Sequence, residues 1–208
     1  MTTYCPAIVL IAASLKLVAQ IPPTDPGSSP PPPVPCCLIV DVMPVPQSLK
    51  QLVDMSSLIV EGVVEKVMPS RRGAGQTWIE IDSVIRIAQT WKGSAGGSTI
   101  VLSQMGGRDG GAADQPTQYS IVQPGERYIL FLSLDDRRAL PSVAGLKRYD
   151  VTAAWAGLLF VGADGLIHTD SKYNDPLRKK YEGKAKAEMI NLLKDALKQK
   201  RLPVPPPL

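Results

Sequence analysis

The chain has 208 residues, of which 44% are hydrophobic and 20% are charged, and its net charge is +4. This composition predicts a real hydrophobic core, whereas so small a net charge does not identify a partner. Of the 20 prolines, 14 lie in residues 21–46 and 203–208, and the remainder of the chain, about 130 to 150 residues, fits one domain rather than several.

The N-terminal segment has the features of an export signal. Residues 6–19 are almost entirely apolar, and Ala19 is a small residue suited to a cleavage site. As a helix this run would span about 21 Å, less than the bilayer core of about 30 Å. We therefore predict that residues 1–19 are a cleaved signal peptide and that the protein is secreted or periplasmic. A misassigned start codon and a cytosolic tail are the alternatives, because residues 1–5 carry no Lys or Arg.

Residues 20–36 form a predicted linker that is rich in proline, serine and glycine and has no hydrophobic periodicity. The run of prolines at residues 30–33 predicts an extended polyproline II segment. It is interpreted as a spacer in an exported protein, with a ligand for a proline-recognition domain as the alternative.

The cysteines do not predict a metal site. Cys5 would leave with the signal peptide, and the two that remain, Cys36 and Cys37, are adjacent. Adjacent cysteines pair with each other only through a strained ring, so intermolecular disulfides and free thiols are equally open. With one histidine in the chain and no Cys-x-x-Cys spacing, four-ligand zinc is not supported, and no cofactor is predicted.

Residues 37–171 are predicted to fold as a mainly β domain. Residues 48–55 have the pattern of one or two helical turns, and Gly62 predicts a bulge or a bend at a barrel corner. The predicted strands are residues 38–42, 57–68, 77–93, 99–103, 127–134, 148–153, 158–161 and 166–168.

The strand at residues 77–93 organises the prediction. One of its faces is apolar and the other is charged, which predicts a half-buried strand with its charges in water. The apolar face carries Ile79, Ile81, Ile85 and Ile87, and the charged face carries Glu80, Asp82 and Arg86.

Two loops contain residues of possible chemical interest. Residues 106–111 have the glycine content of a phosphate-binding loop, but no Gly-Lys-Ser/Thr ending and no helix follows them, which indicates a flexible loop within residues 106–124. Asp135 and Asp136 are followed by two arginines that would compete with a bound cation. That segment is predicted to be a solvated turn.

The C-terminal residues 172–202 are predicted to form an amphipathic helix that docks on the barrel, followed by a disordered Pro-rich tail at 203–208. Asn174 and Pro176 suit a helix start. The predicted apolar stripe consists of Leu177, Tyr181, Ala185, Met189, Leu192 and Ala196. The many basic residues of this segment are interpreted as the solvated face of that helix.

A family resemblance follows from the order of these motifs. SLIVEGVV is followed by a strand ending in WKG, then by TIVL with Gly-Gly, by PGERYILFL and by GLLFV. This order, across residues 48–168, resembles a largely uncharacterised family of exported bacterial proteins. The resemblance implies a small antiparallel OB-like barrel and an extracytoplasmic location, and it implies no catalytic residue.

The only histidine, His168, is the one candidate for catalysis. It could act as a general base oriented by Asp170, but a base needs a nucleophile, and no Gly-x-Ser-x-Gly motif is present. A dyad of His168 with Cys36 would require the fold to join distant residues. No catalytic residue is therefore predicted.

Trp78 is the candidate binding residue, because it is predicted to lie on the outward face of the central strand, where an OB-like barrel could stack a base or another ring. Trp91 and Trp155 could equally pack in the core or at its rim. Glu80 and Asp82 on the same strand would repel phosphate, which argues against nucleic acid as the partner.

The sequence as a whole favours an exported, non-catalytic β-barrel module that binds a macromolecular or envelope partner. The alternatives are a hydrolytic enzyme that uses His168 and an extracellular protease inhibitor that would need Cys36 as its first residue. No transmembrane span is predicted.

Overall fold

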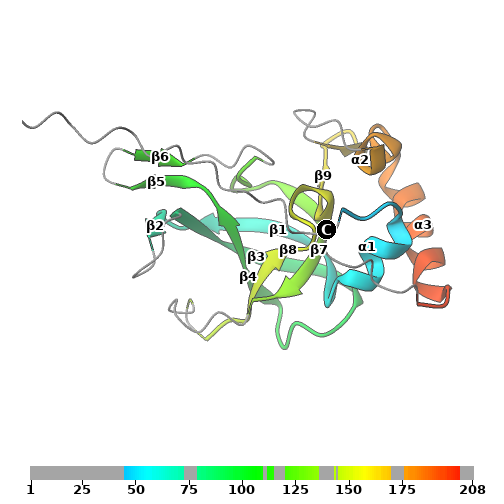
Figure 1. Cartoon of the computed structure of the whole chain (residues 1–208), viewed down its shortest axis with the longest axis horizontal. Helices are drawn as coiled ribbons and strands as arrows, with labels where there is room; N and C mark the ends of the chain where they lie inside the picture. The colour runs from blue at the N-terminus through cyan, green and yellow to red at the C-terminus, as the bar shows by residue number, and fades with distance from the viewer. Residues whose placement is uncertain are drawn as a thin grey trace, which may run out of the picture. The chain divides into compact units, whose positions relative to one another are not determined.

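The computed structural model describes residues 45–72, 79–109, 112–114, 120–135, 143, 145–169 and 176–201. The chain divides into two units, Met1–Cys36 and Cys37–Leu208, and all described residues belong to the second. The predicted strand at 38–42 lies outside the described residues. The elements (Figure 1) are α1 (Leu49–Met55), β1 (Leu58–Val67), β2 (Arg71–Arg72), β3 (Ile79–Lys92), β4 (Thr99–Met105), β5 (Gly107–Asp109), β6 (Ala112–Asp114), β7 (Arg127–Leu134), β8 (Arg148–Val151), the 3₁₀ helix η1 (Ala154–Gly157), β9 (Leu158–Val161), β10 (Ile167–His168), α2 (Pro176–Tyr181) and α3 (Lys186–Lys198).

Five strands close into a barrel. β1 pairs with β3, β3 with β4, β4 with β8, β8 with β7, and β7 again with β1. The pairings are antiparallel except that residues 101–103 of β4 run parallel to residues 148–150 of β8. A closed five-stranded barrel with such a crossover is OB-like. The prediction of a mainly β, small OB-like barrel with a C-terminal helix is confirmed.

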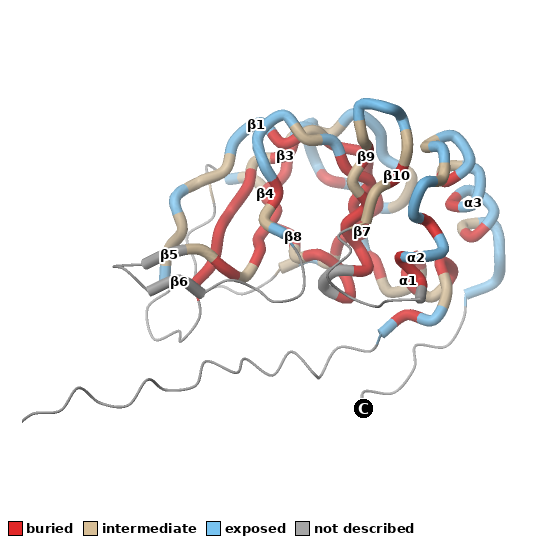
Figure 2. The backbone as a smooth tube through the Cα atoms, turned by 90° about the horizontal axis from the view of Figure 1, so that it is seen from above, coloured by how far each residue is buried: buried red, intermediate tan, exposed pale blue. Residues whose placement is uncertain are grey.

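Successive side chains of β1 and β7 enter two different hydrophobic clusters. One cluster, here the barrel core, receives side chains from all five barrel strands: Leu58, Val60, Val64, Ile85, Ala95, Ile100, Leu102, Val122, Tyr128, Leu130, Leu132, Tyr149, Val151 and Leu158. The other, here the helix-side core, joins the outer face of β1, β7 and β9 to the helices, and includes Ile59, Ile129, Phe131, Leu159, Met189 and Leu193. Because side chains alternate along a strand, these strands are buried on both faces. In Figure 2 buried residues, drawn in red, lie along β7 and along parts of α1 and α2.

Gly62 lies at a break in the β1–β3 register, between Glu61 and Gly62, as its position in an apolar strand predicts. A Cβ atom at Gly62 would lie 2.4 Å from Cγ2 of Ile85. The glycine therefore allows the two strands to approach closely at the bend.

The alternation predicted for the central strand is present in β3, but two of the three residues on its charged face are not in water. Ile79 and Ile85 are fully buried, and Arg86 is exposed. Glu80 and Asp82, by contrast, are only 1% and 3% exposed. The expectation of a solvated charged face is wrong for these two residues, because ion pairs described below cover them.

The loop expected at residues 106–124 contains a short hairpin, because β5 pairs with β6 from Gly107↔Asp114 to Asp109↔Ala112.

The segment between β8 and β9 interrupts the sheet. Both β8 and β9 pair with the same edge of β7, and the intervening residues, which include η1, loop out of the sheet. Gly157 ends this excursion at a point where a Cβ atom would lie 2.8 Å from the carbonyl oxygen of Phe131.

The C-terminal helix is divided into α2 and α3. The break falls at Gly183, whose φ of 72° belongs to the left-handed region that favours glycine. Within α3 the buried positions are Met189, Leu193 and Ala196, whereas Leu192 is 36% exposed, so the predicted stripe is wrong at Leu192. Ala185, also predicted in the stripe, is exposed and lies at the N-cap of α3 rather than inside a helix. None of the helices within the described ranges is long and apolar enough to span a membrane.

The segment between α2 and α3 covers the outer edge of β10. Gly183 N donates to Ile167 O at 2.8 Å, and Ile167 N donates to Lys184 O at 2.8 Å. Lys186 N donates to Gly165 O at 2.9 Å. The last strand of the sheet is therefore paired on both sides.

Candidate functional site

A groove of about 880 Å³ lies between the β9–β10 hairpin, the turn that precedes β7 and the first turn of α3. The turn contributes Pro124 to Arg127, the hairpin contributes Phe160 to Ala163 together with Gly165, and α3 contributes Lys186 and Ala187. Concave, partly apolar surfaces of this size at the junction of several elements are typical of ligand sites. We define this surface as the hairpin groove.

Phe160 provides the aromatic part of the groove. Its side chain is half-buried, and its ring lies 5.5 Å from that of Tyr128 in a tilted arrangement. The ring of His168 lies 6.0 Å away on the neighbouring strand. The exposed part of Phe160 is therefore held in one orientation and could contact an apolar or planar group of a ligand.

A buried carboxylate organises the charged wall of the groove. The side chain of Glu61 is 5% exposed and accepts a hydrogen bond from Lys186 Nζ at 2.7 Å. Arg127 Nη1 donates to the same oxygen at 3.4 Å. Glu61 thus holds two cationic side chains that line the groove, and it balances part of their charge.

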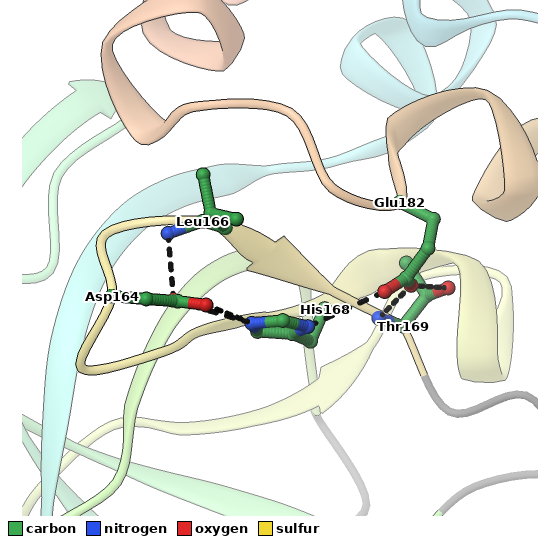
Figure 3. A network of polar contacts seen from close by, with 5 residues as sticks. All are labelled: Asp164, Leu166, His168, Thr169 and Glu182. Carbon is green, nitrogen blue, oxygen red and sulfur yellow. Dashed lines mark hydrogen bonds and ion pairs between the residues drawn. The ribbon is translucent and has the colours of Figure 1, made fainter.

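His168 connects the turn of the β9–β10 hairpin to the residue that follows α2 (Figure 3). His168 Nε2 lies 3.1 Å from Asp164 Oδ2, and Nδ1 lies 3.3 Å from Glu182 Oε1. The second oxygen of Glu182 accepts hydrogen bonds from both the backbone N–H and the hydroxyl of Thr169, each at 2.6 Å. Asp164 also accepts from Leu166 N at 3.0 Å. The network ties the hairpin turn to the end of α2.

Gly162 leaves the space that this network needs. A Cβ atom at this position would lie 2.4 Å from Asp164 Oδ1 and 2.8 Å from His168 Nε2. Any larger residue would therefore push apart the pair that braces the hairpin.

The pKa values around His168 shift in the directions that favour its charged form. The hydrogen bond with Asp164 raises the pKa of His168, and Glu182 adds to this effect. The Leu166 amide and His168 lower the pKa of Asp164. For Glu182, burial opposes ionisation, but the hydrogen bonds from Thr169 and His168 prevail and lower its pKa.

We expect His168 to stabilise the fold within a defined pH window. A raised pKa gives stability that is complete below the usual His value of 6.5 and is lost as pH rises through the folded value. The lowered carboxylate values give stability that is complete above 4.5 and is lost on acidification. The stability difference between wild type and His168→Gln should therefore be largest between pH 4.5 and 6.5, measured by urea unfolding across pH.

Titration of the His168 ring by NMR provides a direct check. Because His168 is the only histidine, its signal needs no further assignment. Asp164→Asn should move its pKa down toward the usual value, and an unchanged pKa in that variant would refute the assigned role of Asp164.

The arrangement does not provide His168 with a nucleophile among the described residues. Both ring nitrogens face carboxylates, and the neighbouring Thr169 hydroxyl donates to Glu182 rather than to the ring. Asp170, the partner expected from the sequence, lies outside the described residues. Sequence reasoning missed Asp164 and Glu182, although Asp164 stands four residues before His168 across a predicted turn.

The other residues singled out in the sequence lie apart from the groove or outside the description. Trp78 and the three cysteines are outside the described residues. Trp91 is partly buried and packs against the helix-side core. The side chain of Trp155 is also outside the described part of the chain. In that part, no group of three or more His, Cys, Asp or Glu side chains is placed to hold a metal ion.

A buried ion cluster occupies the outer face of β3 and β4, which is the usual ligand face of an OB barrel. Arg148 Nη2 lies 2.6 Å from Glu80 Oε2 and 3.1 Å from Asp82 Oδ1, and it donates to Ser103 Oγ at 2.5 Å. Arg148 Nε lies 3.2 Å from Asp135 Oδ2. The solvated turn expected around Asp135 is wrong for this residue, whose side chain is 1% exposed. Sequence reasoning missed Arg148 entirely.

A second arginine completes this cluster. Arg71 Nη2 donates to Asp82 Oδ2 at 2.6 Å. Burial raises the pKa of Asp82, although Arg148 and Arg71 oppose that shift. The three carboxylates, with side chains only 1–2% exposed, are paired with Arg148 and Arg71 and so face these arginines rather than a ligand.

No protein-family model matches the chain, and no curated protein is similar enough to count as a match.

Proposed function

We propose that this protein is an exported, non-catalytic binding module that holds an extended polypeptide segment of an envelope or extracellular partner in the hairpin groove. The observation that carries the proposal is the combination of a fixed aromatic ring, Phe160, with two cations anchored on the buried Glu61. Such a surface offers contact area and orientation without a group poised for chemistry.

The shape and charge of the groove favour a polypeptide. Gly125 and Gly165 have no atom within 4 Å of where a Cβ would stand, so the backbone at the rim is open to a ligand. The lining cations Arg127 and Lys186 are offset by Glu126 within the lining and by Glu61 beneath it. A nearly balanced groove is poorly suited to a polyanion.

The packing of the barrel interior also supports ligand binding on the surface of the protein. Side chains from all five strands fill it, including Ile85, Ile100, Leu102, Leu130 and Leu132, each fully buried. Small barrels filled in this way bind ligands on their surfaces and at their loops rather than inside. The export part of the proposal is supported by the apolar segment 6–19 and the Pro-rich linker that follows it.

Site-specific photocrosslinking in the native host tests both parts of the proposal. A photoreactive benzoylphenylalanine in place of Ala187, which lines the groove, should form a discrete adduct in the extracytoplasmic fraction. The same replacement at Leu192, exposed on the same helix but outside the groove lining, should form none. Protease sensitivity of the added mass identifies the partner as a polypeptide.

Equal adducts at Ala187 and Leu192 would mean that capture is not specific to the groove. An adduct that survives protease treatment would replace the polypeptide with another polymer. Adducts confined to the cytoplasm would contradict export.

A further inference from the structure

A second cleft, of about 480 Å³, lies at the other end of α3. It is formed by α1 and the two serines that follow it, by Lys92 at the end of β3, and by Leu197, Gln199 and Arg201. Its lining shares no residue with that of the hairpin groove. A helix of 13 residues spans about 20 Å, so the two sites are separate, and this inference does not depend on the proposed function.

The cleft carries an excess of positive charge. Among the residues that the structure describes, its lining includes three cationic side chains, Lys50, Lys92 and Arg201, and a single carboxylate, Asp54. Lys50 is 7% exposed and forms an ion pair with Asp54 along the same face of α1. That pair is electrically balanced, so Lys92 and Arg201 supply the excess of two charges.

Lys92 is held toward the cleft by one hydrogen bond. Its Nζ donates to Val53 O at 2.6 Å, in the last turn of α1, where helix carbonyls lack helical partners. An ammonium group has three donors, so two remain for a ligand. Burial lowers the pKa of Lys92; Asp54 opposes this shift, and the like charges of Arg201 and Lys50 add to it. A bound anion would relieve this repulsion.

We propose that this cleft binds a phosphate monoester, with its phosphate between Lys92 and Arg201. A phosphate monoester carries a charge of about −1.5 to −2 at neutral pH, which matches the excess of two positive charges better than a carboxylate does. The cleft is larger than one phosphate, and Val53, Met55 and Leu197 provide apolar surface for the rest of the molecule. The group could belong to a soluble metabolite or to a lipid head group.

Calorimetric titration of the folded full chain with glycerol 3-phosphate, at constant ionic strength, tests the proposal. We expect saturable binding with one site. Arg201→Gln and Lys92→Gln should each weaken it by about tenfold, as the loss of one charge-assisted hydrogen bond predicts. Arg201 is exposed, so its variant reports on binding even where Lys92→Gln alters stability through Val53.

Lys194→Gln is the matched control, because Lys194 is exposed on α3 and lies outside both linings. It removes the same charge and should leave the affinity within about twofold. An equal loss in Lys194→Gln, or no saturable binding to the wild type, would overturn the site. Flotation with phosphatidylcholine vesicles, with and without phosphatidic acid, shows whether a lipid supplies the phosphate.

Discussion

Arg148→Met is expected to destabilise the protein by about 3 to 5 kcal/mol, the cost of leaving buried charges without their partner. Arg148 is 6% exposed and contacts Glu80, Asp82 and Asp135. Methionine fills a similar volume, so the loss is electrostatic rather than a cavity effect. Urea unfolding at neutral pH measures it.

The sign of the pH dependence distinguishes this cause from a packing defect. Without the arginine, protonation relieves the cost of the buried negative charge. The loss of unfolding free energy in Arg148→Met should therefore be smaller at about pH 4 than at neutral pH. If the loss of unfolding free energy is the same at neutral pH and at about pH 4, the effect comes from packing and not from the charges.

Arg86→Met is the matched control for this substitution. Arg86 pairs with Glu65 at 2.9 Å, but the two side chains are 55% and 43% exposed. Exposed pairs of this kind contribute about 0 to 1 kcal/mol. A loss in Arg86→Met as large as that in Arg148→Met would show that burial is not what makes the Arg148 cluster important.

Leu130→Ala and Phe131→Ala should both be costly, although adjacent residues of a strand point to opposite faces. Leu130 enters the barrel core and Phe131 the helix-side core, and both are fully buried. We expect losses of about 2 to 5 kcal/mol for the leucine and 3 to 5 kcal/mol for the phenylalanine. Chemical denaturation of the two variants measures these losses.

Leu134→Ala, at the end of the same strand, is the control. Leu134 is 55% exposed, so its truncation should change stability by no more than about 0.5 kcal/mol. A small effect of Phe131→Ala beside a large effect of Leu130→Ala would contradict the packing of the helices against the outer face of β7.

The barrel could be predicted because its strands follow local rules. Period-2 alternation identified β3, apolar runs identified β1 and β7, and Gly62 marked the bend that the structure shows. The break between α2 and α3 was less accessible, because a helical pattern can run through Gly183 with little change in hydrophobic spacing. Only the positive φ of that glycine shows where the phase restarts.

The candidate sites were predicted less well because their partners are distant in sequence. A charged strand face looks the same whether it meets water or an arginine, and Arg148 reaches Glu80 from 68 residues away. Glu61 and Lys186 are 125 residues apart. His168 stood out as the only histidine, but its partner Glu182 comes from a segment whose approach depends on the helix break.

The covered edge of β10 has a consequence for self-association. An uncovered strand edge offers backbone donors and acceptors to another copy of the chain and invites fibril growth. Here the backbone of residues 183–186 already pairs with that edge, while closure of the barrel pairs β1 with β7. The residues between α2 and α3 thus prevent this edge from pairing with another copy, and a truncation before Gly183 would expose both that edge and the apolar surface beneath α3.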